Sequence, residues 1–151
     1  MTDSAPRSRL QLALNVEDLD QAVDFYSKMF GVPVAKRKPG YANFAVEDPP
    51  LKLVLFEKPK ASERINHLGV EVFEDAEVTQ ATERLKTAGL SHLVEDETTC
   101  CYAKQNKVWA KEPDGIRWEW YHVLADADAF GHDAPEVPAA DPVVQTERSC
   151  C

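Results

Sequence analysis

The stretch HLGVEV at residues 67–72 decides the fold, because it repeats the pattern of QLALNV at residues 11–16, 56 positions earlier in the chain. In both stretches apolar residues alternate with small or polar ones, and this period of two is typical of a strand with one buried face. Because side chains alternate between the two faces of a strand, Gln11 and His67 take equivalent positions on the face opposite the aliphatic side chains. The two stretches therefore predict two copies of one structural module.

The residues after each opening strand predict the same order of elements in both halves. Each half continues with an amphipathic helix, with acidic residues at its start and a glycine at its end. The apolar positions expected on one face of each helix are Ala22, Phe25 and Met29 in the first half and Val78, Ala81 and Leu85 in the second. Three strand-like runs follow each helix, at residues 32–38, 41–46 and 51–57 and at residues 92–97, 103–111 and 116–123. The sequence therefore predicts an α+β fold of two tandem β-α-β-β-β modules that form a concave sheet.

The modules cover about residues 9–57 and 65–123, so residues 1–124 are expected to form one domain. The composition changes after this domain, because residues 125–151 hold six acidic residues, one basic residue and three prolines. Such a composition is typical of a segment that buries little apolar surface. The sequence therefore predicts that residues 125–151 form a flexible acidic tail that ends in a cysteine pair.

The overall composition excludes several classes of protein. Hydrophobic residues make up 44% and charged residues 28% of the 151 residues, as in an ordinary globular protein. The net charge of −9 argues against a nucleic acid as the partner. No apolar run is long enough to cross a membrane and no signal-peptide pattern is visible, so we expect a cytoplasmic protein with a small-molecule partner.

The four cysteines occur as two adjacent pairs, Cys100–Cys101 and Cys150–Cys151. Neighbouring cysteines do not easily form an ordinary disulfide, whereas two thiolates side by side suit a soft element that takes two sulfurs at once, such as trivalent arsenic or cadmium. The alternative is that a free cysteine is simply a small buried hydrophobic residue. A single pair would leave the two explanations balanced, but two pairs without an isolated cysteine favour a function.

A second candidate site combines Gln11 and His67 with Glu119. Glu119 alternates with Trp118 and Trp120, so it points to the concave side if the tryptophans pack against the helices. One imidazole, one carboxylate and one amide oxygen suit a divalent first-row metal and leave positions open for a substrate or dioxygen. Alternatively, His67 is a hydrogen-bonded core residue and Glu119 faces solvent.

The doubled module, with Pro113-Asp114-Gly115 shortly before Glu119, resembles the vicinal oxygen chelate superfamily. That superfamily includes glyoxalase I, extradiol dioxygenases and fosfomycin-resistance enzymes. A narrower resemblance is to the ArsI-type carbon–arsenic lyases, and the cadmium-induced protein CadI shares the same stretches. This resemblance covers residues 10–16, 36–45, 48–55, 66–71 and 98–103, and the last stretch contains the distinctive Thr-Thr-Cys-Cys element.

The narrower resemblance implies an Fe(II)-dependent, O2-consuming enzyme of arsenic detoxification. Such an enzyme cleaves the carbon–arsenic bond of trivalent organoarsenicals such as methylarsenite and leaves inorganic arsenite. By motif position, the resemblance implies that the metal ligands are Gln11, His67 and Glu119. It also implies that Cys100 and Cys101 bind the arsenic, on what we expect to be a mobile loop.

Further roles of single residues are hypotheses. Lys104 is the nearest cation in the sequence that would lower the pKa of the thiols, and Tyr102 would donate to a bound oxygen. For both residues, an ordinary strand or loop side chain is the alternative. Cys150 and Cys151 would capture the substrate and pass it inward, or they are incidental thiols of the tail. Turnover at limiting substrate after truncation of the tail separates these two explanations.

Two other functions stay open. One is a thiol-based cadmium- or arsenic-binding protein without turnover, which tight cadmium binding without oxygen uptake would support. The other is a glyoxalase-like lyase, which turnover of a hemithioacetal with Ni(II) or Zn(II) would support. The sequence also leaves open whether the two modules pair within one chain or between the two chains of a homodimer.

Overall fold

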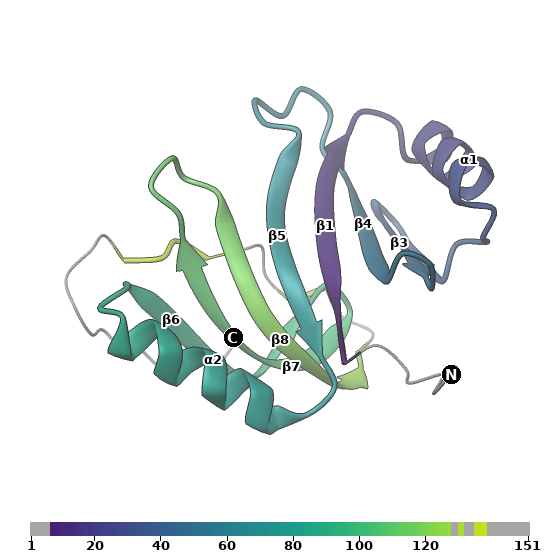
Figure 1. Cartoon of the computed structure of the whole chain (residues 1–151). Helices are drawn as coiled ribbons and strands as arrows, with labels where there is room; N and C mark the ends of the chain where they lie inside the picture. Colours follow the sequence, from purple (N-terminus) through teal and green to yellow (C-terminus); the bar gives the residue numbers. More distant parts are fainter. Residues whose placement is uncertain (1–6, 128–129, 132–134, 139–151) are drawn as a thin grey trace. The chain divides into compact units, whose positions relative to one another are not determined.

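The computed structural model describes residues 7–127, 130–131 and 135–138. Its elements in chain order are β1 (Ser8–Val16), α1 (Leu19–Phe30), β2 (Lys36–Lys38), β3 (Tyr41–Val46), β4 (Leu51–Glu57), β5 (Ile65–Val72), α2 (Asp75–Thr87), β6 (His92–Cys100), β7 (Ala103–Lys111) and β8 (Arg117–Asp126). The order β-α-β-β-β occurs twice (Figure 1), which confirms the predicted α+β class and the duplicated module. Neither helix in the described residues is long and apolar enough to cross a membrane. The chain divides into two compact units, Met1–Leu68 and Gly69–Cys151.

The first unit pairs its strands in the order β2-β3-β4-β1, with β1 parallel to β4. Helix α1 begins after Asp18, whose carboxylate accepts the backbone N–H of Gln21, and it ends at Gly31, which adopts the left-handed conformation. Leu12 and Leu14 of β1 pack against the core under this helix, so β1 carries Gln11 on its other face. The buried members of that core are Val16, Leu19, Ala42, Phe44, Leu53 and Leu55.

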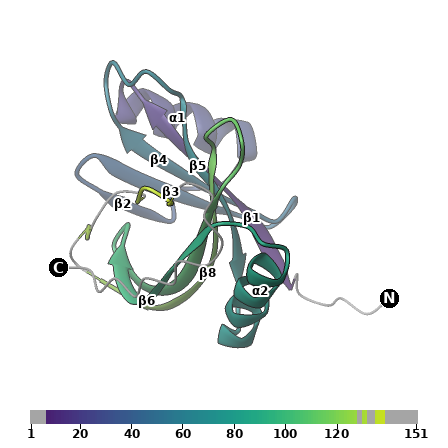
Figure 2. The ribbon, with the colours of Figure 1, turned by 90° about the vertical axis from the view of Figure 1, so that its left-hand side faces the viewer.

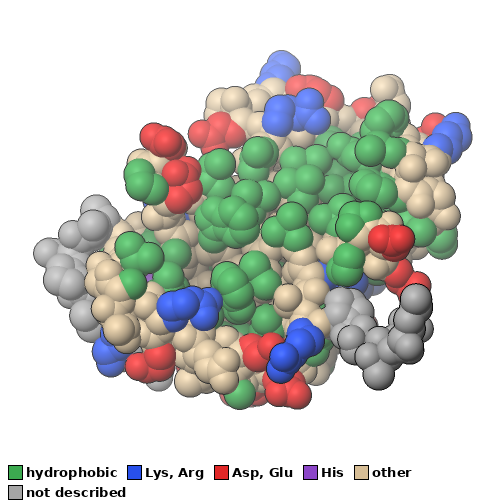
Figure 3. Space-filling model, viewed as in Figure 1, with side chains coloured by type: hydrophobic (Ala, Val, Ile, Leu, Met, Phe, Trp, Pro, Cys, Tyr) green, Lys and Arg blue, Asp and Glu red, His purple; other side chains and the backbone are tan. Residues whose placement is uncertain are grey.

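The face of α1 that enters this core differs from the expected one. Phe25 is 58% and Met29 is 62% exposed, whereas Leu19 is buried and both Tyr26 and Phe30 pack against the core. The expected stripe is wrong at Phe25 and Met29, whereas its third member, Ala22, packs against the core. The helix has apolar residues on more than one side, and a spacing of three and four residues fits either stripe. Hydrophobic side chains accordingly lie at the surface over α1 (Figure 3).

The second unit contains the antiparallel strands β8-β7-β6, with α2 against one face of them (Figure 1 and Figure 2). Val78 and Ala81 are buried in α2, as the helical spacing predicts. Trp120 of β8 also lies on the helix side, because the guanidinium of Arg84 in α2 is 4.9 Å from the centre of its ring. The opposite face of β8 therefore carries Glu119.

Strand β6 is longer than expected and ends in the first cysteine of the pair. Cys100 pairs with Ala103 of β7, which leaves Cys101 and Tyr102 as a two-residue hairpin turn. The expected mobile loop is therefore a tight turn held by the sheet. Both turn residues have a positive φ, 53° and 60°, which glycine and asparagine adopt more readily. Backbone strain of this kind is frequent at functional sites.

The chain stays in contact with the second unit beyond the expected end of the domain. Strand β8 continues to Asp126, past the expected boundary at residue 124. Further on, Val137 is buried in a small cluster with Leu93 and Trp109. The cysteine pair at positions 150–151 lies outside the described residues, so the tail and its role stay predictions.

Candidate functional site

The first part of the site comes from the polar side chains near the starts of β1 and β5. Burial alternates in the same way along both strands, and Gln11 and His67 occupy the same place in that pattern. Both side chains are buried, and the Nε2 atoms of Gln11 and His67 lie 3.1 Å apart. The equivalence of the two positions in the repeat therefore corresponds to a direct contact inside the first unit.

A chain of hydrogen bonds fixes the protonation of His67. It begins at the backbone carbonyl of Glu63, which can only accept, so the Asn15 side chain donates to it through Nδ2 at 2.9 Å. Oδ1 of Asn15 then accepts from Nδ2 of Asn66 at 3.0 Å, and Oδ1 of Asn66 accepts from Nδ1 of His67 at 2.8 Å. In the neutral ring this selects the tautomer with its proton on Nδ1, and Nε2 of His67 then accepts the amide N–H of Gln11.

This arrangement fits a metal ligand. A histidine that binds a metal uses an unprotonated ring nitrogen, while its other N–H donates to a neighbouring oxygen. His67 has both features, with Asn66 as the acceptor. A half-turn of the Gln11 amide directs its oxygen, in place of its N–H, to the same point. The imidazole and the amide of the first unit therefore suit a divalent first-row metal.

The second unit contributes a buried carboxylate that forms an ion pair with a buried ammonium. The side chains of Glu119 and Lys107 are 3% and 1% exposed, and Oε2 lies 2.7 Å from Nζ. The ammonium also lies 5.2 Å and 5.6 Å from the ring centres of Trp109 and Tyr121. Burial alone lowers the pKa of Lys107, but Cys100 and Glu119 stabilise its charged form and the net result is a raised pKa. Lys107 is therefore a stable positive charge on this face of the strands.

The thiol pair lies on the same face as this ion pair. Cys100 stands opposite Ala103 in the register of β6 and β7, and Lys107 follows Ala103 on the same face of β7. The Sγ atoms of Cys100 and Cys101 are 3.5 Å apart. The hydrogen bond with Cys100 raises the pKa of Cys101 well above its usual value, burial raises it further, and the charge of Lys107 opposes both effects. The Cys101 thiol is therefore neutral near pH 7.

A bulge in β6 brings the first cysteine to this face. Glu95 pairs with Lys107, and the two residues after Glu95 together oppose a single residue of β7. Glu97, the second of these two, has a φ of 50°, and its backbone N–H donates to the Asn106 side chain at 2.7 Å. The extra residue shifts the alternation by one position. As a result, Glu95 and Cys100 face the same side although five positions separate them.

The cation beside the thiols is Lys107, and the expectation that Lys104 takes this place is wrong. Nζ of Lys104 lies 3.1 Å from Oε1 of Glu97, and both side chains are exposed. Tyr102 packs its ring edge-on against Phe130, at a centroid distance of 5.6 Å. The sequence signal for Lys107 is the alternation along β7, in which a lysine takes an inward position.

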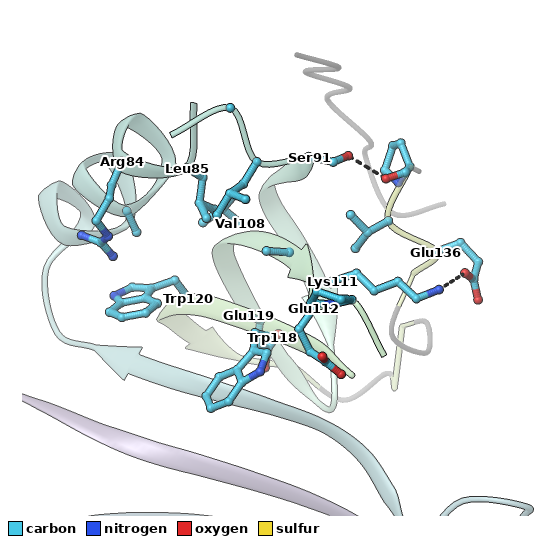
Figure 4. Close-up of a pocket in the computed structure, with 17 residues that line it drawn as sticks. Arg84, Leu85, Ser91, Val108, Lys111, Glu112, Trp118, Glu119, Trp120 and Glu136 are labelled. Atoms are coloured by element: carbon cyan, nitrogen blue, oxygen red, sulfur yellow. Dashed lines mark hydrogen bonds and ion pairs between the residues drawn. The ribbon is translucent and has the colours of Figure 1, made fainter. Parts of the chain in front are cut away.

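A separate pocket of about 990 Å³ lies on the helix side of the second unit, between α2 and the strands (Figure 4). Its walls include Leu85, Leu90, Trp118 and Trp120, and Lys111 lies near its edge (Figure 4). None of the cysteines in the described residues lines this pocket. Glu119 is among the residues that line this pocket, whereas Cys100 and Cys101 lie outside it.

The expected metal ligands are distributed over both units, with Gln11 and His67 in the first and Glu119 in the second. In the part of the chain that the structure describes, no three His, Cys, Asp or Glu side chains form a metal-binding group. The expected metal-binding set contains one histidine, one carboxylate and one amide, and a group of His, Cys, Asp and Glu side chains does not count the amide of Gln11. The assignment of these three residues as metal ligands therefore depends on the chemistry of their side chains. That assignment stays a prediction.

The sequence and the fold define the class of protein. Residues 9–120 match the family described as Glyoxalase/Bleomycin resistance protein/Dioxygenase superfamily, and the chain belongs to that superfamily. The chain is similar to the cadmium-induced protein CadI of Mycobacterium tuberculosis, with 57% identity over 124 residues that cover 82% of each protein. It is also 54% identical to the trivalent organoarsenical cleaving enzyme of Thermomonospora curvata, over 82% of each protein. These relatives confirm the narrower resemblance.

A more distant relative and two solved structures extend this comparison. The trivalent organoarsenical cleaving enzyme of Bacillus sp. is 35% identical over 93% of this chain and 88% of its own. An Mn(II)-bound glyoxalase from Novosphingobium aromaticivorans superposes with a TM-score of 0.58 and 19% identity, over 80% of this chain and 41% of its own. A catechol 2,3-dioxygenase superposes with a TM-score of 0.53 and 16% identity, over 90% of this chain and 47% of its own. The two structures confirm the fold.

Proposed function

We propose that the protein is an Fe(II)-dependent, O2-consuming lyase that cleaves the carbon–arsenic bond of trivalent organoarsenicals such as methylarsenite. The observation that carries this proposal is the thiol pair, whose sulfurs are 3.5 Å apart on the face that holds the buried pair of Lys107 and Glu119. The name of the Thermomonospora relative, a trivalent organoarsenical cleaving enzyme, supports the class of substrate. The product is inorganic arsenite, and the biological role is detoxification.

In the proposed reaction, Cys100 and Cys101 first bind the arsenic. Methylarsenite carries two hydroxyl groups, and each thiol replaces one of them. Two arsenic–sulfur bonds form, two arsenic–oxygen bonds break, and each thiol proton leaves with a hydroxide as water, so arsenic stays trivalent. The raised pKa of Cys101 keeps its thiol protonated near pH 7, so this residue brings its own proton to the exchange. Two bonds also orient the arsenic better than one bond does.

The proposed ligands of the metal are Gln11, His67 and Glu119, and Fe(II) bound there supplies the activation of dioxygen. His67 offers the lone pair of Nε2 without losing a proton, because Asn66 holds the proton of the ring on Nδ1. Glu119 adds a negative charge that suits a divalent ion. Lys107 keeps a positive charge between this carboxylate and the thiol pair.

We also propose that the protein works in the cytoplasm. The thiol pair binds arsenic only in its reduced form, and the cytoplasm keeps thiols reduced. The only partner that the proposal requires is the small-molecule substrate.

The test is a single-turnover experiment. The protein is loaded with Fe(II) without oxygen, mixed with methylarsenite and then exposed to air, and the arsenic species are separated by chromatography. We expect the parent protein to release arsenite, and we expect Cys100→Ser and Cys101→Ser to lose that release. The matched control is the double variant Cys150→Ser/Cys151→Ser, which leaves the first pair intact. Release of arsenite at the parent rate by folded, iron-loaded Cys100→Ser and Cys101→Ser contradicts the proposal.

A second candidate function is the binding of cadmium or arsenic by the thiols without turnover. It is favoured by the name of the CadI relative, a cadmium-induced protein. In that case the parent protein binds Cd(II) tightly, but it takes up no oxygen and leaves methylarsenite intact in the experiment above. Oxygen uptake that depends on methylarsenite excludes this alternative.

A further inference from the structure

Lys107 has a second carboxylate beside it, on the strand opposite Glu119. Glu95 of β6 stands directly opposite Lys107 in the register of β6 and β7, and it is 1% exposed. Residues directly opposite each other in an antiparallel pair have their Cβ atoms about 5 Å apart, within reach of long side chains. The ammonium of Lys107 therefore lies on a strand between two strands that each carry a buried carboxylate.

The proposed metal site creates a conflict for the ammonium. Nζ of Lys107 lies 2.7 Å from Oε2 of Glu119, the carboxylate that we propose as a metal ligand. A divalent ion at this carboxylate repels the ammonium, whereas a buried ammonium that loses its carboxylate partner is strongly unfavourable. When Glu119 turns to a metal, Cys100 still stabilises the ammonium, and a second carboxylate within reach replaces the lost ion pair.

We propose that Glu95 is this second partner, and that the ammonium of Lys107 moves from Glu119 towards Glu95 when Glu119 binds the divalent ion. The inference rests on the proposed function, because it takes Glu119 as a metal ligand. Glu95 is on the same strand and the same face as Cys100, so the ammonium stays beside the thiol pair after the move. Glu95 is a positioning residue that acts on the metal through Lys107. The bulge in β6 is what places Glu95 and Cys100 on one face.

The test measures metal binding without turnover. Co(II) is titrated into the protein under reducing conditions, and the dissociation constant is measured by calorimetry and by the absorption of the bound ion. We expect Glu95→Gln to weaken Co(II) binding about tenfold, as with other residues that support a metal ligand. Glu97→Gln, an exposed carboxylate on the same strand, is the matched control and leaves the affinity unchanged.

Two more variants separate a positioning role from a structural one. Lys107→Met removes the competing charge, so it binds Co(II) at least as tightly as the parent protein. The double variant Glu95→Gln/Lys107→Met then regains the affinity of Lys107→Met, because Glu95 acts only through the ammonium. Parent-like affinity in Glu95→Gln overturns the inference, as does a double variant that binds as weakly as Glu95→Gln. If the parent protein itself binds no Co(II), the proposed metal site fails and not this inference alone.

Discussion

At the scale of single residues, the chemistry of the first unit depends on the direction of hydrogen bonds. Gln11 and His67 are in contact, but contact alone does not say which ring nitrogen has the proton. Asn15 and Asn66 settle this, because each uses its oxygen on one neighbour and its N–H on the other. These two asparagines therefore support the residues that would touch a metal.

This leads to a prediction for Asn66. Replacement by alanine removes the acceptor at Nδ1 of His67, so the ring no longer favours the tautomer with a lone pair on Nε2. We expect Asn66→Ala to weaken Co(II) binding about tenfold to a hundredfold while the protein stays folded, and His67→Ala to abolish binding. Calorimetric titration measures both effects.

The control for this titration is Gln80→Ala, which removes an exposed amide of α2. It is expected to bind Co(II) like the parent protein. Unchanged affinity in Asn66→Ala would show that the ring orientation does not depend on this hydrogen bond.

The sequence predicts some of these residues and not others, for physical reasons. The pairing of Gln11 with His67 follows from an internal repeat, because equal positions in two copies of a module are related by symmetry. Asn66 has no comparable signal, since an asparagine beside a histidine does not by itself indicate a contact between their side chains. Lys107 is missed because a lysine is rarely buried without a partner, and its partner is on another strand.

At the scale of elements, the bulge in β6 decides which residues share a face. It depends on Glu97, which has a φ of 50° and lies opposite Asn106. A side chain with a Cβ atom is strained in this conformation, whereas glycine is not. The ion pair of Glu97 with Lys104 is exposed and adds little to stability.

We therefore predict that Glu97→Gly stabilises the protein by about 0.5 to 1 kcal/mol. The neighbouring residue Asp96 is not among the residues with a positive φ, so Asp96→Gly is expected to destabilise it by about 0.5 to 1 kcal/mol. Urea denaturation of both variants measures the two free energies of unfolding. A change of the same sign in both variants would show that the conformation at the bulge carries no strain.

Elements defined by local chemistry were predictable, and elements defined by distant contacts were not. The start of α1 at Asp18 and its end at Gly31 follow from capping rules that need only neighbouring residues. The expected strand at 92–97 stops where the regular alternation breaks, although β6 continues to Cys100. A bulge breaks that alternation, and at the bulge the backbone N–H of Glu97 donates to Asn106 of the next strand.

At the scale of the whole molecule, the buried thiol and the buried ammonium make stability depend on pH. The pKa of Cys101 and the pKa of Lys107 are both raised in the folded protein. Between about pH 8.5 and the raised value, cysteine thiols lose protons in the unfolded chain but Cys101 keeps its proton in the folded state. Lys107 behaves in the same way above about pH 10.4. In both ranges the folded state binds more protons, so a rise in pH favours unfolding.

We therefore predict that the free energy of unfolding changes little between about pH 7 and 8 and falls as the pH rises above about 8.5. Urea denaturation in the presence of a reductant, at several pH values, measures this slope. Cys101→Ser lacks the thiol, so its slope between about pH 8.5 and 10 is expected to be shallower. A free energy of unfolding that increases over this range would contradict the raised pKa of Cys101.

The duplicated module is the part of the whole molecule that the sequence predicts best. Each copy carries its own turns, caps and alternation, so many local signals agree on one answer. The end of the domain is less predictable. Val137 lies in a segment of acidic, proline-rich composition, and only its contact with Leu93 and Trp109 brings it into the second unit.

The hydrogen bonds that end at His67 begin at a main-chain oxygen, that of Glu63, and this has a consequence for genome surveys. Mutation replaces side chains but leaves a backbone carbonyl in place. The direction of donation in all of these hydrogen bonds is therefore set by the backbone. A related protein that retains the histidine but has lost either asparagine keeps the proposed metal ligand. It loses the hydrogen bonds that set the tautomer of that ligand. Surveys that aim to separate active members from inactive ones should therefore score positions 15 and 66 together with the proposed ligands.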